Sequence, residues 1–458
     1  MSGEASSQEK QVDEQVLCDE EQHALSPQEA LYLAILWHQN ERIQEAEQLY
    51  RKLLEFNPED PSVLNFFGMA RYQQGYAEEG IASIKKALEL APDYIDAENN
   101  LGNIYLLTGH PELAEPCFRR VIAFNANFAP AYGNLGIVLK ELELYQEAID
   151  CLQKAIELEP DMPRNYQNLG NVYRHLGRHH EAVTLYRKSL ELAPYDEGAY
   201  LRLTRTLFVM GELEECAKVL KQWLDYAPDN PTALHMHAAY TLVDAPARAS
   251  DAYVKETFDR FAASFDGVLK RLDYQAPDLV LQALQTLEPN PETWLILDAG
   301  CGTGLCGELI RPWAKVLVGA DLSPKMLEQA KARKVYDQLF EAELTAFFSQ
   351  AGFAYDAITC ADTFCYFGDL TAVAKAALNA VKPGGWFIFT LEKHETDQSF
   401  QLHPHGRYSH SENYVRQTLA NAGFKVEGIE TAILRKERGD DVQGLVITAQ
   451  ARSGFPAA

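Results

Sequence analysis

The stretch that decides the fold of this chain runs from Trp294 to Gly304 and reads WLILDAGCGTG. Its first four residues are apolar, which is typical of a parallel-sheet strand that is covered on both faces. The three glycines at alternate positions predict a tight turn, because glycine lets the backbone approach a ligand closely. A strand, a glycine-rich turn and a helix together form a binding crevice at the carboxyl edge of a parallel sheet.

Strands and helices alternate on the carboxyl side of this stretch. Further apolar runs occur at 316–320, 356–361 and 386–391. Helical patterns separate them, which predicts an α/β domain with a mostly parallel sheet. Two later apolar segments, 424–434 and 444–451, flank the polar residues RKERGDDVQ and predict a terminal antiparallel hairpin. We assign this domain to residues 291–458.

Three motifs indicate which cofactor the crevice binds. Asp298 precedes the glycines, Asp321 begins the motif DLSPKM, and KPGG at 382–385 leads into the fifth strand. Together these motifs resemble the class I S-adenosylmethionine-dependent methyltransferases over about residues 251–451. The resemblance implies a Rossmann-like fold, methyltransferase activity and S-adenosyl-L-methionine as the cofactor. A carboxylate at Asp321 can accept both ribose hydroxyls and would disfavour a 2′-phosphate.

The resemblance also implies roles for the residues of these motifs. Asp298 and the loop backbone would hold the amino-acid end of the cofactor, and Asp321 would bind its ribose. Glu343 would meet the adenine amino group, and Asp362 would lie near the methionine part. The full set of expected cofactor-binding residues is Asp298, Gly300, Cys301, Gly302, Gly304, Asp321, Leu322, Met326, Glu343, Leu344 and Asp362, in which Leu322 and Met326 lie against the adenine.

The catalytic residues are less defined. Methyl transfer from a sulfonium depends mainly on positioning and desolvation, and a general base is needed only if the acceptor must lose a proton. Candidate bases are His394 and His410 after the fifth strand, although exposed loop histidines are an equally good interpretation. Tyr366, after the fourth strand, is a candidate residue of the acceptor pocket. His403 and His405, which are further candidates, could instead bind a metal ion, but nothing completes such a site, so we predict none.

The segment CADTFCYFGDL at 360–370 bears on the methyl acceptor. It lacks the Asn-Pro-Pro-Tyr or Asp-Pro-Pro-Tyr motif that grips planar amide or amino groups. The paired-glutamate loop of arginine methyltransferases is absent from the sequence as well. We therefore expect an oxygen, carbon, sulfur or less familiar nitrogen acceptor.

Residues 251–277, on the amino side of the first strand, form an amphipathic helical pattern with phenylalanines and leucines on one side. Their segment FDRFAASFD at 258–266 is similar to the lid helix of many small-molecule methyltransferases. We therefore expect lid or docking helices over 251–290.

Farther upstream the sequence repeats every 34 residues. The repeat is carried by Gly68, Gly102, Gly136 and Gly170 and by Pro58, Pro92, Pro160, Pro194 and Pro228. This spacing resembles the tetratricopeptide repeat, which implies six helix pairs over 27–230 stacked into an all-α superhelix. Residues 231–250 would supply a capping helix and a linker, with the linker near 243–250.

Asparagines recur within the repeats. Asn100, Asn134 and Asn168 share one position, and Asn103 and Asn171 lie three residues further along the same helical face. The segments around them resemble repeats of the O-linked N-acetylglucosamine transferases, in which an asparagine ladder grips peptide backbone. We expect a peptide-binding role, because a carboxamide matches both the N–H and the C=O of an extended peptide. Hydrogen bonds between neighbouring repeats are the alternative.

Composition narrows the class of protein. The 458 residues include 41 basic and 66 acidic side chains, and this net charge of −25 argues against nucleic-acid binding. The sequence has no apolar run of membrane-spanning length, and its acidic first 26 residues read as a disordered tail rather than a signal peptide. Eight cysteines without a Cys-x-x-Cys pair favour a reducing compartment, so we expect a cytoplasmic protein.

Three hypotheses remain open. The first is an active methyltransferase whose array binds a peptide or protein partner or substrate. The second is a small-molecule methyltransferase whose array serves assembly, and the third is a scaffold without turnover. The intact set of Asp298, the glycines and Asp321 argues against the third hypothesis. The oligomeric state is not predicted.

Overall fold

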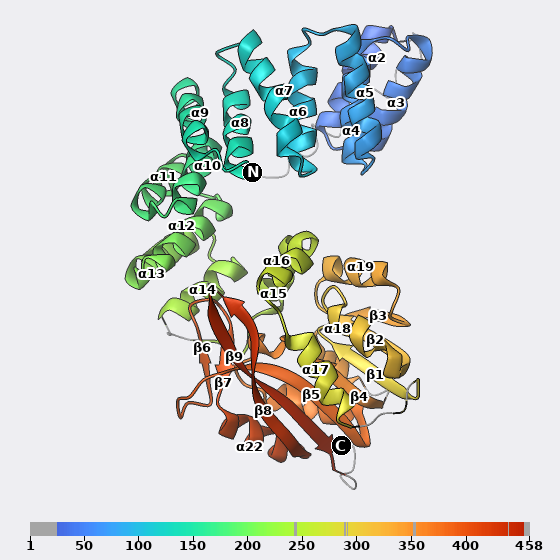
Figure 1. The fold of residues 1–458 in the computed structure, drawn as a ribbon, viewed down its shortest axis with the longest axis vertical. Coiled ribbons are helices and arrows are strands. Elements are labelled where there is room, and N and C mark those ends of the chain that lie inside the picture. The colour runs from blue at the N-terminus through green and yellow to red at the C-terminus, as the bar shows by residue number, and fades with distance from the viewer. Residues whose placement is uncertain are drawn as a thin grey trace, which may run out of the picture. The chain divides into compact units, whose positions relative to one another are not determined.

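The computed structural model of the chain describes residues 25–241, 245–287, 290, 292–350, 354–437 and 439–452. Most of the expected acidic tail at 1–26 therefore lies outside the described residues. The chain drawn in Figure 1 divides into two compact units, with the division between Thr206 and Leu207.

The first unit consists of antiparallel helix pairs, which confirms the predicted repeat array. The first helices of the pairs are α2 (Pro27–Gln39), α4 (Pro61–Gln73), α6 (Ile95–Leu107), α8 (Ala129–Glu141), α10 (Pro163–His175) and α12 (Glu197–Val209). The second helices are α3 (Ile43–Phe56), α5 (Ala77–Leu90), α7 (Pro111–Phe124), α9 (Tyr145–Leu158) and α11 (His179–Leu192). Each set therefore begins at intervals of 34 residues.

The repeated glycines let the two helices of a pair approach each other closely. A Cβ at Gly136 would lie 2.5 Å from Cγ of Leu152, and one at Gly170 would lie 2.7 Å from Cε1 of Tyr186. These distances are too short for any side chain, so the large residue of the second helix fills the space above each glycine.

The second unit begins with helices. They are α13 (Leu213–Tyr226), α14 (Pro231–Thr241), α15 (Asp251–Phe261), α16 (Phe265–Arg271) and α17 (Ala276–Gln285). Helix α14 packs against the sheet domain, because Ala238 and Ala239 share a buried cluster with Leu402 and Tyr408. Of the expected linker, 243–244 lie outside the described residues, and the Ala249 amide donates to Tyr366 O at 2.8 Å.

The rest of the second unit is an α/β domain. Its strands are β1 (Trp294–Ala299), β2 (Ala314–Asp321), β3 (Gln338–Glu341), β4 (Tyr355–Cys360), β5 (Val381–Lys393), β6 (Phe400–Leu402), β7 (Tyr408–His410), β8 (Phe424–Glu437) and β9 (Asp440–Ala451). Its helices are α18 (Leu305–Ile310), α19 (Pro324–Arg333), α20 (Leu344–Ser349), α21 (Thr371–Ala380) and α22 (Glu412–Ala422).

The sheet has the order β3-β2-β1-β4-β5-β7-β6, and β1 to β5 run parallel to one another. Strand β9 pairs antiparallel with β5 and with β8, which confirms the predicted terminal hairpin. Apolar side chains such as Leu297, Ile358 and Phe387 form the core, and they hold the carboxyl ends of the central strands at one edge. Within the described ranges, no helix is long and apolar enough to span a bilayer.

Candidate active site at the carboxyl edge of the sheet

The glycine loop, defined as Gly300–Gly304, follows β1 and is fastened to β2. Gly300 N donates to Ala320 O at 2.7 Å, and Gly302 N donates to Oδ2 of Asp321 at 2.9 Å. Gly300 has a φ of +70°, and a Cβ there would lie 2.2 Å from Oγ1 of Thr363. Only glycine satisfies both constraints, so the loop backbone passes directly beside the end of β4.

Asp298 lies beneath this loop and is fully buried. Its Oδ2 accepts a hydrogen bond of 2.7 Å from the hydroxyl of Tyr336, a residue for which no motif gave a signal. Its Oδ1 is buried without a hydrogen-bond partner in the described part of the chain. Burial raises the pKa of Asp298 to about 6, although the hydrogen bond from Tyr336 acts in the opposite direction and lowers it.

Asp321 ends β2, where the resemblance places the ribose. Its Oδ1 accepts from the amide of Ser323 at 2.9 Å, and burial raises its pKa. The hydroxyl of Ser323 accepts from Met326 N at 3.1 Å and so caps α19. Met326 is completely buried, whereas Leu322 is only half-buried. Asp321 and Leu322 thus lie beside the glycine loop, while Met326 belongs to the core.

Glu343 and Leu344, which were also expected at the adenine end, have structural roles. The carboxylate of Glu343 accepts from the amides of Thr345 at 3.0 Å and Ala346 at 2.8 Å, and so caps α20. Leu344 is buried. Glu341, which the sequence analysis did not select, is the residue in register with Asp321 at the sheet edge. A role for Glu343 at the adenine stays a prediction.

Helices α15 and α16 are tied to the edge of the sheet by polar side chains. Lys255 pairs with Glu341 at 2.6 Å. The hydroxyl of Ser323 donates to Asp259 at 2.6 Å, and the hydroxyl of Thr303 donates to Asp266 at 2.6 Å. These contacts anchor both helices above the glycine loop. Both aspartates lie in the segment FDRFAASFD, which the sequence analysis had already singled out, so the sequence contained a signal for these two contacts.

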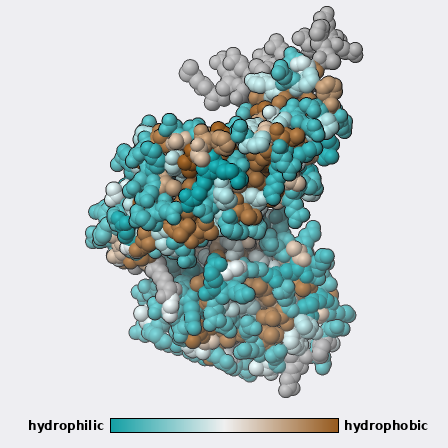
Figure 2. Space-filling model, turned by 45° about the horizontal axis from the view of Figure 1, so that its top comes forward, coloured by the Kyte–Doolittle hydropathy of each residue, from teal (hydrophilic) through white to brown (hydrophobic). Residues whose placement is uncertain are grey.

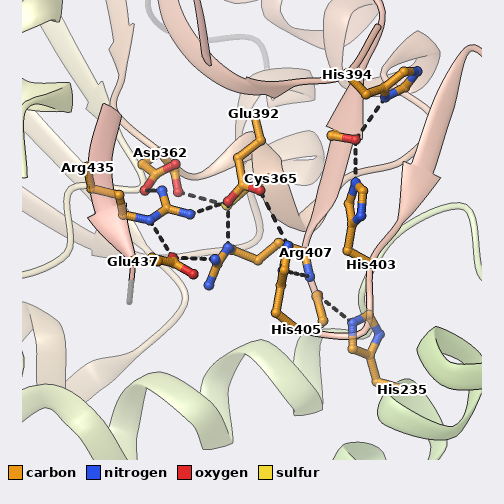
Figure 3. Close-up of polar contacts among 12 residues, drawn as sticks. His235, Asp362, Cys365, Glu392, His394, His403, His405, Arg407, Arg435 and Glu437 are labelled. Carbon is orange, nitrogen blue, oxygen red and sulfur yellow. Dashed lines mark hydrogen bonds and ion pairs between the residues drawn. The ribbon is translucent and has the colours of Figure 1, made fainter. Parts of the chain in front are cut away.

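A buried ionic cluster lies beside the ends of β4 and β5 (Figure 3). It consists of Asp362, Glu392, Arg407, Arg435 and Glu437. Arg435 pairs with Asp362 at 2.6 Å and also with Glu392, and Arg407 pairs with Glu392 at 2.6 Å. Burial raises the pKa of Glu392, but the two guanidinium groups outweigh it and lower that pKa to about 2.

Asp362 is the member of the ionic cluster that the sequence analysis selected. It adopts a φ of +55°, and its amide donates to the Thr390 hydroxyl at 2.8 Å. Burial raises its pKa, against the charge of Arg435. Its Oδ1 is buried and has no hydrogen-bond partner among the described residues. The structure therefore brings Asp298, Asp321 and Asp362 to the same edge of the sheet.

The candidate bases differ in their surroundings. His410 is fully buried and its Nε2 donates to Gly368 O at 3.0 Å, while burial lowers its pKa to about 4. It is a core histidine, which corrects the expectation of a base there. His394 donates to Gln398 O at 2.8 Å and lies 2.8 Å from Oγ of Ser409. Tyr366 stays half-buried, with its ring 5.4 Å from that of Phe258.

The remaining histidines of this region do not gather as ligands. Nε2 of His403 lies 2.6 Å from the Ser409 hydroxyl, and the ring of His405 stacks on that of His403 (Figure 3). Burial lowers the pKa of His405 to about 4. In the part of the chain that the structure describes, no three His, Cys, Asp or Glu side chains could hold a metal ion.

The asparagines of the array partly bond to one another. Asn134 donates to Asn103 at 2.8 Å, and Asn100 donates to Asn65 of the preceding repeat at 3.0 Å. Asn171 accepts from the hydroxyl of Tyr186 at 2.9 Å. Asn168 makes no hydrogen bond to the described residues and is half-buried. Hydrogen bonds between neighbouring repeats, the alternative interpretation, therefore apply to Asn100 and Asn134. Peptide binding stays a prediction.

Exposed apolar side chains also occur along the array, among them Tyr32, Phe56 and Tyr195, each more than 70% exposed. Figure 2 shows apolar residues in brown interspersed with hydrophilic residues in teal on the visible face. Scattered apolar residues of this kind are ordinary for a protein surface, so they do not by themselves mark a binding site.

Comparison with known proteins agrees with both units. A family described as a methyltransferase domain matches residues 268–428. Families of the tetratricopeptide repeat match residues 61–94, 96–128, 129–162, 151–184 and 174–240.

Methyltransferase-like protein 27 of Homo sapiens is 34% identical over 148 residues, which cover 31% of this chain and 60% of that protein. The chain thus spans less than two thirds of the length of this relative. The ubiquinone biosynthesis O-methyltransferase of Hydrogenovibrio crunogenus is 31% identical over 171 residues, which cover 34% of this chain and 68% of that enzyme. A tetratricopeptide-repeat protein of Thermus thermophilus, known from a crystal structure, is 25% identical in the matched region. The match covers 40% of this chain and 100% of that protein, with a TM-score of 0.36.

Proposed function

The chain belongs to the methyltransferase family and carries tetratricopeptide repeats, and from this premise we propose that it is an S-adenosylmethionine-dependent methyltransferase whose array binds a peptide or protein. We place it in the cytoplasm as part of this proposal, since its eight cysteines include no Cys-x-x-Cys pair.

One observation carries the assignment of the cofactor. The glycine loop lies between Asp298 and Asp321 at the end of β2, and Oδ1 of Asp298 is buried without a hydrogen-bond partner among the described residues. An unpaired buried carboxylate oxygen is costly, so it fits the ammonium of the cofactor's amino-acid end. Asp321, which already orients the loop, would bind the ribose hydroxyls. Oδ1 of Asp362 is likewise buried without a hydrogen-bond partner among the described residues, and we propose that it lies near the methionine part.

When bound, S-adenosylmethionine supplies an electrophilic methyl group that an acceptor with a lone pair can take. The chain contributes positioning and exclusion of water, because Asp259 and Asp266 hold the lid helices against the edge of the sheet. If the acceptor must lose a proton, we propose His394 as the group that receives it. Tyr366 is proposed only as a residue of the acceptor pocket, because burial raises the pKa of its hydroxyl and keeps it protonated. His410 is not proposed, because it is fully buried and its Nε2 donates to Gly368 O.

A specific observation favours a small-molecule acceptor as the second candidate. The relatives include O-methyltransferases of ubiquinone biosynthesis, and several polar contacts fasten the lid helices over the site. In this case the array would serve assembly. The bonds Asn134–Asn103 and Asn100–Asn65 agree with such a structural role for the ladder.

Radiolabelled methyl transfer into cell extract, separated by size, distinguishes the two acceptor classes. Label in protein that is lost when Asn134 and Asn168 are replaced by serine supports delivery by the array. Label only in small molecules supports the second candidate. The Asp321→Ala variant is the control for cofactor use, and label that persists in it contradicts the assigned cofactor site.

Truncation is unsuitable for this purpose because α14 is part of the second unit. Nε2 of His235 donates to Gly406 O at 2.8 Å, and its ring stacks on Tyr253 of α15 at 4.1 Å. Removing residues up to 245 would therefore expose the sheet domain and disturb α15. Point substitutions in the array avoid this effect.

A further inference from the structure

We propose that Tyr336 is a positioning residue that aims the Asp298 carboxylate at the ammonium group of the cofactor. This inference rests on the proposed function and deepens it. It concerns a side chain that lies between α19 and β3, outside every motif of the nucleotide site.

The Tyr336 ring occupies space that three glycines provide. A Cβ at Gly307 would lie 2.2 Å from the Tyr336 hydroxyl oxygen. A Cβ at Gly304 would lie 3.0 Å from Cε2 of the ring, and one at Gly319 would lie 3.0 Å from Cδ1. These glycines come from the glycine loop, α18 and β2. Gly304, the last glycine of the motif, therefore makes room for a tyrosine of this chain.

The inserted ring determines which carboxylate oxygen of Asp298 is available. Oδ2 accepts the Tyr336 hydroxyl at 2.7 Å, whereas Oδ1 has no partner in the described part of the chain. The nearby hydroxyl of Thr359 donates elsewhere, to Leu297 O at 3.2 Å. A carboxylate with one oxygen saturated cannot rotate freely, so the other keeps a fixed direction and offers a charge-assisted bond to a cation.

The charges around Asp298 make this bond dependent on pH. Burial raises the pKa of Asp298 to about 6, the hydroxyl of Tyr336 lowers it, and the charge of Asp321 raises it. Burial also raises the pKa of Tyr336, so its hydroxyl stays a donor at neutral pH. The titratable groups that face Asp298 are Tyr336 before β3, Asp321 on β2, Cys301 in the glycine loop, Cys306 on α18 and Cys360 on β4. Burial raises the pKa of all three thiols, which leaves Asp321 as the like charge.

The test is Tyr336→Phe in the full chain, with affinities measured by calorimetry for two probes. S-adenosylhomocysteine carries the amino-acid end, and methylthioadenosine lacks it. We expect the variant to bind S-adenosylhomocysteine about tenfold more weakly at pH 7, since a hydrogen bond to a charged group is lost, and to bind methylthioadenosine as before. The midpoint at which acid abolishes S-adenosylhomocysteine binding should move upward by about one pH unit, because Asp298 without its donor protonates more readily.

Two matched variants complete the experiment. Tyr186→Phe removes another buried hydroxyl, which donates to Asn171 at 2.9 Å, and should change neither affinity. Asp298→Asn keeps an acceptor for Tyr336 but removes the charge, so it should weaken S-adenosylhomocysteine alone and abolish the pH dependence. If Tyr336→Phe does not fold, the Asp298→Asn variant tests the inference, which then requires that this variant weaken S-adenosylhomocysteine binding and leave methylthioadenosine binding unchanged.

The outcomes separate this inference from the proposed function. Equal weakening of both probes, in Tyr336→Phe or in Asp298→Asn, would show that the residue only shapes the loop, and overturns the positioning role. Unchanged affinity for both probes in Tyr336→Phe also overturns it. A native chain that binds neither probe refutes the proposed function and this inference together.

Discussion

Replacing Arg435 with methionine should destabilise the second unit by about 3–5 kcal/mol at pH 8, because it leaves buried carboxylates without their cation. The Arg435 side chain is 3% exposed and pairs with Asp362, Glu392 and Glu437. Methionine fills part of the volume but cannot donate a hydrogen bond. Arg407 remains as the other cation of the ionic cluster and moderates the loss.

The lowered pKa of Glu392 gives a second, independent measure of how much the ionic cluster contributes to stability. Its pKa is lowered from 4.5 to about 2, and such a shift corresponds to about 3 kcal/mol of stability at neutral pH. Because the pKa is lowered, this contribution is present above pH 4.5 and is lost as the pH falls toward 2. In the variant, burial without Arg435 raises the pKa of Asp362 further. The deficit of the variant should therefore shrink as the pH falls from 8 to 5.

Urea unfolding followed by tryptophan fluorescence measures this loss at each pH. The signal reports the second unit, which contains Trp223, Trp294, Trp313 and Trp386 of the five tryptophans. The matched control is Arg416→Met, which breaks a pair with Glu412 whose side chains are 49% and 42% exposed, and should cost less than about 1 kcal/mol. An Arg435→Met deficit as small as that of the control, or independent of pH, would refute the reasoning.

Three further substitutions test the site and the array. Gly300→Ala should abolish S-adenosylhomocysteine binding in calorimetry and lower the melting temperature, because its Cβ would lie 2.2 Å from Oγ1 of Thr363; retained affinity contradicts the loop geometry. Asp266→Asn should speed cofactor dissociation in stopped-flow measurements by loosening the lid, and an unchanged rate would show that this contact does not control release. Asn134→Ala should cost about 1 kcal/mol in unfolding of the array, since the bond to Asn103 at 2.8 Å is lost; a neutral substitution would favour a ligand-binding role.

Local patterns predicted the repeats well because each helix pair is assembled from adjacent residues. Gly136 and Leu152 stand sixteen positions apart in one repeat, and their contact recurs with the 34-residue period. The same locality allowed the glycine loop and Asp321 to be recognised, since the loop follows β1 directly and Asp321 is the last residue of β2.

Residues that meet from distant segments escaped prediction. Arg435 lies at the end of the hairpin, where its polar neighbours indicated a turn, yet β8 continues through it to Glu437. Its partner Asp362 is 73 positions away, and nothing in either segment indicates the other. His410 was selected as a candidate base because the pKa of histidine suits that chemistry. In the structure it is fully buried in the core and donates to the carbonyl of Gly368.

The sequence by itself determined the repeat period, the alternation of strands and helices, and the glycine loop just after Asp298, because periodicity and short motifs express local backbone preferences. Only the tertiary structure decided that Tyr336 donates to one oxygen of Asp298, while the other has no hydrogen-bond partner in the part of the chain that is described. It likewise decided that Asp259 and Asp266 anchor α15 and α16 beside the glycine loop. Those contacts join residues 37 to 64 positions apart, so they depend on how helices and strands pack and not on local pattern.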